Sequence, residues 1–227
     1  MSKKLFTLHF SLFFFLFLFC AYGQVDDPRS KKIIDDMTAR FKTYPSVFLN
    51  FSATGTLLQG QQETELTGKL WIKKTDKYKL EIPDQVFYFD GSKIYQYLTE
   101  VKEVNVKKLD PNENNEDIQL FNPLTYFNLS SKSFQSKLVK ESTLNNRRVY
   151  EIDLYPIQVK TTKFSRIRFM IEKSTYQLVY INAIMKDTTQ FAITFKPYDI
   201  QKTALPDSFF TFNKLEHPDV EIIDLSF

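Results

Sequence analysis

Residues 68–97 read GKLWIKKTDKYKLEIPDQVFYFDGSKIYQY, and the pattern of this stretch decides the fold class. Apolar and polar side chains alternate over residues 65–74 and again over 77–82, which is the period of a β-strand with one buried face. Pro83-Asp84 ends the second strand, and Asp90-Gly91-Ser92 between two aromatic runs is typical of a hairpin. The stretch therefore predicts consecutive antiparallel strands.

The same period of two continues on both sides of this stretch and predicts about ten or eleven short strands in meander order. An antiparallel run of this length must curl or close to hide its edges and its apolar face. We therefore expect a mainly β, α+β domain. The further strands are expected within residues 47–54, 103–108, 133–140, 148–154, 164–171, 177–185, 189–196, 210–212 and 220–224.

Two segments break the strand pattern and indicate helices. Over residues 31–42, Ile33, Met37 and Phe41 recur at helical spacing, so we expect an amphipathic helix that Ser30 caps and a proline ends. After the charged connection 110–117, a short apolar patch contains Leu120, Leu124 and Phe127. Both helices are expected to pack on the concave side of the sheet.

The first residues have the layout of a secretory signal peptide. Lys3 and Lys4 precede a run of apolar residues that is interrupted only by Thr7, His9 and Ser11, and Ala21-Tyr22-Gly23 offers a cleavage site. A membrane anchor is the alternative, but a span needs about 20 apolar residues. Cys20 follows a bulky phenylalanine, unlike the cysteine of a lipoprotein signal. We expect residues 1–23 to be removed and 24–227 to form one cysteine-free domain in the periplasm of a Gram-negative cell.

The residues of the expected mature chain argue against most catalytic chemistry. It retains a single histidine, His217, in a terminal loop, so neither a catalytic triad nor a zinc site can be assembled. Asp84 and Asp90 occupy turns, where solvated carboxylates are common. Five glycines in the whole chain leave no phosphate-binding loop. The near-balanced charge offers no nucleic-acid surface. We expect no enzyme, no cofactor and no metal.

Apolar volume remains as the functional feature, and it leaves two interpretations open. A lipid chain gains roughly 0.8 kcal/mol per CH₂ that leaves water, so inward-facing apolar side chains on a curved sheet suit a lipid carrier. The same alternation also lines an ordinary β core. A carrier should enclose a pocket of on the order of several hundred Å³ beneath its lid, whereas an interior packed by its own side chains would favour the ordinary core.

The run from Gly68 to Tyr97 resembles the outer-membrane lipoprotein carrier protein family, LolA. That family shows a Gly-x-Leu-Trp-x-Lys-Arg-Pro-Asn-x-aromatic run, then an Asp-Gly-Lys hairpin and an aromatic strand. Residues 205–212 and 220–224 are similar to its closing elements. The resemblance implies an incomplete barrel of eleven strands with a helical lid. It also implies a monomeric chaperone that takes acylated lipoproteins from an inner-membrane ABC exporter to an outer-membrane acceptor. A carrier of another lipid and an envelope lipoprotein-sensing module are the alternatives.

The resemblance also assigns roles to individual positions. Residues that would form the lid are Ile33, Met37, Phe41, Leu120, Leu124 and Phe127. Residues that would line the lipid-binding cavity are Leu49, Phe51, Leu70, Ile72, Tyr78, Leu80 and Ile82. One position departs from the family, because Lys74-Thr75 stands where the family has an Arg-Pro pair whose arginine latches the lid. A lysine lacks the planar fork of donors, so Lys74 is either a weaker latch or an exposed lysine at a strand end.

Overall fold

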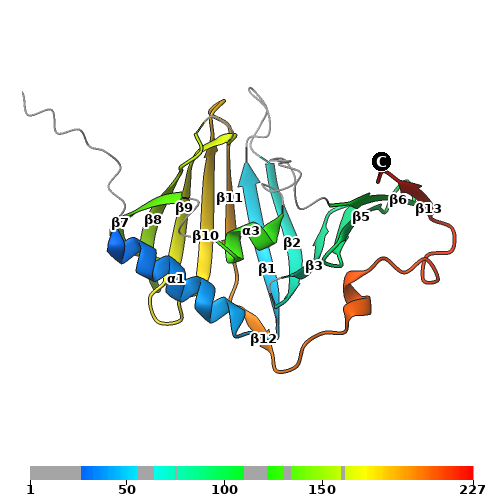
Figure 1. The fold of residues 1–227 in the computed structure, drawn as a ribbon, viewed down its shortest axis with the longest axis horizontal. Helices are drawn as coiled ribbons and strands as arrows, with labels where there is room; N and C mark the ends of the chain where they lie inside the picture. The colour runs from blue at the N-terminus through cyan, green and yellow to red at the C-terminus, as the bar shows by residue number, and fades with distance from the viewer. Residues whose placement is uncertain are drawn as a thin grey trace, which may run out of the picture.

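The computed structural model describes residues 27–55, 64–74, 76–109, 122–129, 134–159 and 162–226. Within these ranges the chain forms one sheet of thirteen strands, two α-helices and a 3-10 helix (Figure 1). In chain order the elements are α1 (Pro28–Lys42), β1 (Ser46–Gly55), β2 (Thr64–Lys73), β3 (Lys77–Ile82), β4 (Gln85–Phe89), β5 (Lys93–Leu98), β6 (Glu103–Lys108), α3 (Pro123–Phe127), β7 (Phe134–Leu144), β8 (Arg147–Pro156), β9 (Phe164–Glu172), β10 (Leu178–Met185), β11 (Gln190–Phe195), β12 (Asp199–Gln201), η1 (Asp207–Phe210) and β13 (Glu221–Asp224).

The sheet is curled but unclosed, with the strand order β13-β6-β5-β4-β3-β2-β1-β11-β10-β9-β8-β7. Strands that are consecutive in the chain are neighbours on each side of α3, and the pairing of β1 with β11 joins the two halves. The expected incomplete antiparallel barrel with helices on one side is confirmed. The strand count exceeds eleven because two short strands add to the sheet: β13 pairs parallel to β6 at one end, and β12 pairs with β1 outside the strand order given above.

Alternation of side chains gives the sheet two different faces. The register places Val47 of β1 opposite Ile72 of β2, and both side chains belong to the main apolar core on the concave face. Successive residues of a strand point to opposite faces. Trp71 therefore lies on the convex face, where it stacks on Phe48 with 4.8 Å between ring centroids.

Helix α1 begins at Pro28, earlier than the sequence pattern indicated. Asp27 caps it by accepting a hydrogen bond from the Arg29 backbone N–H at 2.9 Å, and proline suits the first helical position because its missing N–H needs no partner there. The expectation that Ser30 caps the helix is wrong, since Ser30 lies inside the first turn and is fully buried.

The start of α1 is fastened to the edge strand β7. The Asp27 N–H donates to the Ser136 carbonyl at 3.0 Å, and the Asp27 carboxylate accepts from the Leu138 N–H at 3.2 Å. The Ser30 and Ser136 hydroxyls lie 2.7 Å apart in a buried position. From this attachment α1 runs across the sheet toward β12 (Figure 1).

The segment between β12 and β13 lies on the convex face as a strap, which we define as residues 202–220. The expected strand at 210–212 is wrong, because η1 covers its start and no strand follows until β13. Strands β4 and β5 already have partners on both edges, so the strap attaches through side chains instead. Phe212 and Val220 form a second apolar cluster with residues of β4, β5 and β6. These residues are Tyr88, Tyr95, Tyr97, Val104 and Val106.

Lowering the pH is expected to release the η1 end of the strap. Hydrogen bonds from Lys73 and Lys77 lower the pKa of Asp207 below its ordinary value of 3.8. The ion pairs therefore hold the strap above about pH 4, and the hold is lost as pH falls through the lowered pKa. Trp71 is the single tryptophan, and its ring centroid lies 5.7 Å from that of Phe209 in η1. A change in Trp71 fluorescence should therefore report the release of η1.

Asp207→Asn provides the control for this titration, because it removes the charge at every pH. We expect the variant to show the altered Trp71 emission already at neutral pH and no transition below pH 4 that depends on this carboxyl group. Identical titration curves for the two proteins would contradict a role of Asp207 in holding the strap.

The convex face of β8 and β9 buries two carboxylates. Glu151 and Asp153 are both nearly inaccessible to solvent. Arg168 contacts Asp153 through two hydrogen bonds of 2.7 and 2.9 Å, and Arg166 reaches the same carboxylate at 3.3 Å. Glu151 lies 3.6 Å from Lys140. These contacts compensate charges that would otherwise destabilise the sheet.

Candidate functional site

The concave face is a continuous apolar surface, and the expected cavity residues lie on it. All seven belong to the main core or pack against it. Those from β1 and β2 and Tyr78 of β3 are buried, whereas Leu80 and Ile82 near the end of β3 are only half-buried. Burial raises the pKa of Tyr78 far above its ordinary value, so its phenol stays neutral. The structure thus brings these residues together on one face.

Gly68 has a physical reason to open the motif run. It lies directly opposite Phe51 in the β1–β2 pairing, and the Phe51 ring covers it. A Cβ atom at this position would lie 2.3 Å from the ring and 2.8 Å from the Glu81 carbonyl oxygen. The absent side chain therefore lets the Phe51 ring lie flat over the concave face.

Helix α1 turns its apolar stripe toward this face. Ile33, Met37 and Phe41 are all buried, as the lid assignment requires. Tyr44 extends the stripe by one further turn beyond the helix and contacts Phe41 with 6.0 Å between ring centroids. Tyr44 was missed in the sequence, although its spacing from Phe41 continues the helical pattern.

Helix α3 lies over the middle of the sheet, in front of β11, β1 and β2 (Figure 1). Leu124 and Phe127 are buried there, and Leu120 lies outside the described residues. The Phe127 ring stacks on Phe41 of α1 at 4.5 Å. The two expected lid segments therefore meet, and their contact occupies the centre of the concave face.

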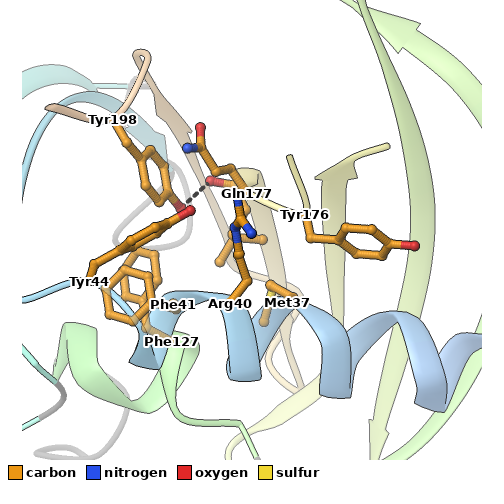
Figure 2. A pocket seen from close by; sticks show the side chains of 9 residues that line it. Met37, Arg40, Phe41, Tyr44, Phe127, Tyr176, Gln177 and Tyr198 are labelled. Atoms are coloured by element: carbon orange, nitrogen blue, oxygen red, sulfur yellow. Dashed lines mark hydrogen bonds between the residues drawn. The ribbon is translucent and has the colours of Figure 1, made fainter. Parts of the chain in front are cut away.

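The described residues form one narrow cleft where the two helices meet the sheet. It has a volume of about 210 Å³, open solvent included, and lies between α1, α3, the turn before β10 and the segment before β12 (Figure 2). This cleft is too narrow to admit a water molecule. Phe41 and Phe127 line it, and the Phe195 ring centroid lies 5.6 Å from that of Phe127. The pattern of apolar residues defined the face but not the volume above it.

Tyr198 is the residue of this cleft that the sequence gave no reason to select. It follows β11 in a segment without a clear period, yet its hydroxyl donates to the Leu178 carbonyl at 2.7 Å (Figure 2). Burial, reinforced by the nearby Tyr44, raises the pKa of Tyr198 well above its ordinary value. Its ring also contacts Phe41 and Phe127, each with 6.4 Å between centroids.

Lys74 lies at the turn between β2 and β3, with an exposed side chain and a positive φ of 51°. Its backbone N–H donates to the Pro45 carbonyl at 3.1 Å. Within the described part of the chain, its ammonium group makes no hydrogen bond or ion pair. The contact of Lys74 with lid carbonyls therefore stays a prediction, and the turn itself is what this residue forms here.

The concave face, its two helices and the cleft together form a mainly apolar site. The described ranges contain no group of three or more His, Cys, Asp or Glu side chains placed to hold a metal ion. Across the same ranges, no helix has the length and apolar character that a membrane span requires. The expected signal peptide, residues 1–23, lies outside the described residues.

Comparison with known proteins places this architecture in a family. The outer membrane lipoprotein carrier protein LolA family matches residues 43–213. No curated protein sequence matches the chain. An uncharacterized conserved protein from Thermus thermophilus has a similar structure, with a TM-score of 0.55 at 9% identity over 84% of this chain and 98% of that one.

Two further solved structures are similar over most of their length. A LolA superfamily protein from Nitrosomonas europaea gives a TM-score of 0.41 at 9% identity, over 81% of this chain and 97% of that one. LprF from Mycobacterium bovis gives a TM-score of 0.44 at 11% identity, over 80% of this chain and 98% of that one. The family match covers most of the chain, and its fold is that of binding and carrier proteins. The chain therefore belongs to the outer membrane lipoprotein carrier protein LolA family.

Proposed function

We propose that this protein is a periplasmic chaperone that binds the acyl chains of lipoproteins and carries them from the inner to the outer membrane. The acyl chains would lie between the concave face of the sheet and the helices α1 and α3. An inner-membrane ABC exporter would supply the lipoprotein, and an outer-membrane acceptor would receive it. The proposal is for a binding protein, without a catalytic step.

The observation that carries this proposal is that two helices cover part of the apolar concave face. The strands supply the larger part of the buried core, and the helices add Ile33, Ile34, Met37 and Phe41 from α1 and Leu124, Tyr126 and Phe127 from α3. Helix α3 spans only Pro123–Phe127, and Phe127 stacks on Phe41 of α1. Just after α3, the Leu129 carbonyl accepts a 3.4 Å hydrogen bond from Thr38. Displacing α3 would uncover apolar surface without breaking the strand pairing.

The free energy gained by burying an acyl chain exceeds the cost of moving α3 off the sheet. Re-exposing the buried side chains of α3, which are Leu124, Tyr126 and Phe127, costs about 1.5–3 kcal/mol each. An acyl chain of about 16 carbons gains roughly 12 kcal/mol when it leaves water at about 0.8 kcal/mol per CH₂. A concave face that α3 covers is therefore compatible with transport, provided that the lipid takes the place of α3.

Isolation from the cell envelope tests the proposal. The full chain is expressed with its own N-terminal segment, purified from an envelope extract without detergent, and analysed by mass spectrometry for bound ligands. We expect acylated lipoprotein to co-purify with the protein at a substantial fraction of its molar amount. Co-expression with an excess of one lipoprotein should increase that fraction.

The other outcomes separate the alternatives. Free lipid without any lipoprotein would indicate a carrier of another cargo. Protein that remains attached to the membrane while it binds lipoprotein would favour a sensing module. Repeated recovery of ligand-free protein under these conditions would refute the carrier proposal, and the ordinary-core interpretation would then hold.

A further inference from the structure

The cleft at the end of α1 combines an aromatic wall with three polar groups that converge on it. Figure 2 shows the Arg40 side chain extending from α1 toward Gln177, with Tyr44 and Tyr198 beside them. Tyr44 is only 8% exposed, yet no side-chain oxygen or nitrogen atom of the described residues is sealed in the interior without a partner. The Tyr44 hydroxyl therefore opens toward the cleft.

In the part of the chain that the structure describes, the Arg40 guanidinium, the Tyr44 hydroxyl and the Gln177 amide make no side-chain hydrogen bond or ion pair. All three can donate hydrogen bonds. A pocket with a few convergent donors on an apolar wall is the usual form of a ligand site.

Arg40 is the charged residue of this cleft. Among the described residues, no ion pair engages its guanidinium group. The acid one turn before Arg40 on α1 is Asp36, and Lys32 binds it through contacts of 2.8 and 3.0 Å. An arginine without a described carboxylate partner thus lies at the opening of the cleft.

We propose that this cleft, which is closed to water while Phe127 stacks on Phe41, becomes the headgroup subsite of the carrier when α3 is displaced, and that it selects lipids with an anionic headgroup. The inference rests on the proposed function, because the acyl chains would enter between Phe41 and Phe127, which form the inner wall of the cleft. The Arg40 guanidinium group would donate two hydrogen bonds to two oxygens of one phosphate or carboxylate group. The Tyr44 hydroxyl and the Gln177 amide would donate hydrogen bonds to neighbouring oxygens.

Competition binding distinguishes the headgroup from the chain. A fluorescent fatty acid is bound to protein purified from the envelope, and it is displaced by lysophosphatidylglycerol, lysophosphatidylcholine of the same acyl chain, or inorganic phosphate alone. We expect the anionic lysolipid to compete about tenfold better than the zwitterionic one, and phosphate not to compete at all. Arg40→Gln should reduce the preference severalfold while lysophosphatidylcholine binding is unchanged.

Arg148→Gln is the matched control, because it removes the same charge at a residue that does not line the cleft. It should keep the full preference. Equal competition by both lysolipids would overturn the headgroup inference and leave the carrier function standing. Failure of both lysolipids to bind would overturn the two together. Displacement by inorganic phosphate, or an unchanged preference in Arg40→Gln, would also overturn the inference.

Discussion

Replacing Arg168 with methionine is expected to lower the free energy of unfolding by about 3 kcal/mol, because a buried carboxylate that loses its partner remains as an uncompensated charge. Asp153 is 3% exposed and depends on two hydrogen bonds from the Arg168 guanidinium. The longer contact from Arg166, at 3.3 Å, would remain and limit the loss. Denaturant-induced unfolding, followed by circular dichroism, measures the difference.

Asp153→Asn is the partner variant, and it should cost clearly less. The Arg168 side chain is about a quarter exposed, so its charge keeps part of its hydration when Asp153 is neutral. It also retains Glu151 at 3.6 Å. A larger loss in Asp153→Asn than in Arg168→Met would contradict this account, since the asymmetry follows from which of the two charges is buried.

Replacing Phe127 with alanine is expected to destabilise the protein less than replacing Phe169, although both rings are almost completely buried. A buried phenylalanine in a rigid core costs about 3–5 kcal/mol when it is truncated, and Phe169 in the centre of β9 should show this full loss. Phe127 belongs to α3. If α3 can leave the sheet, the loss at Phe127 cannot exceed the free energy that holds α3 in place.

The same Phe127 variant should bind acyl chains more tightly. When a ligand binds only the open state, its apparent affinity is proportional to the fraction of molecules that are open. Each 1.4 kcal/mol by which the variant destabilises the closed state should therefore tighten the apparent binding about tenfold. Titration of Phe127→Ala and Phe169→Ala with a fluorescent fatty acid checks this. Equal stability losses together with unchanged affinity would show that α3 is part of a fixed core.

Most of the sheet follows from its period of two, because one buried face imposes alternation on every strand. Strands β2 and β9 show the expected alternation, with Ile72 and Phe169 in the core and Trp71 and Arg168 on the opposite face. The helix stripe at Ile33, Met37 and Phe41 is predictable for the same reason. Patterns of this kind report which side of an element is covered.

They do not report what covers it or how much space remains. Tyr198 joins the cleft through a hydrogen bond to a strand that lies far from it in the chain, and no local spacing signals such a contact. Asp153 alternates like a solvated residue, yet arginines from the neighbouring strand cover it. The filling of the concave face by Phe41 and Phe127 depends on how the two helices meet.

The attachment of Asp27 to β7 and of β13 to β6 bears on self-association at high protein concentration. An unclosed sheet offers two rows of backbone donors and acceptors, and neighbouring molecules could extend such rows into fibres. Here the segment at the start of α1 occupies part of one border, and the strand at the other border, β13, is only four residues long. Both borders of the open sheet are therefore partly protected against edge-to-edge pairing.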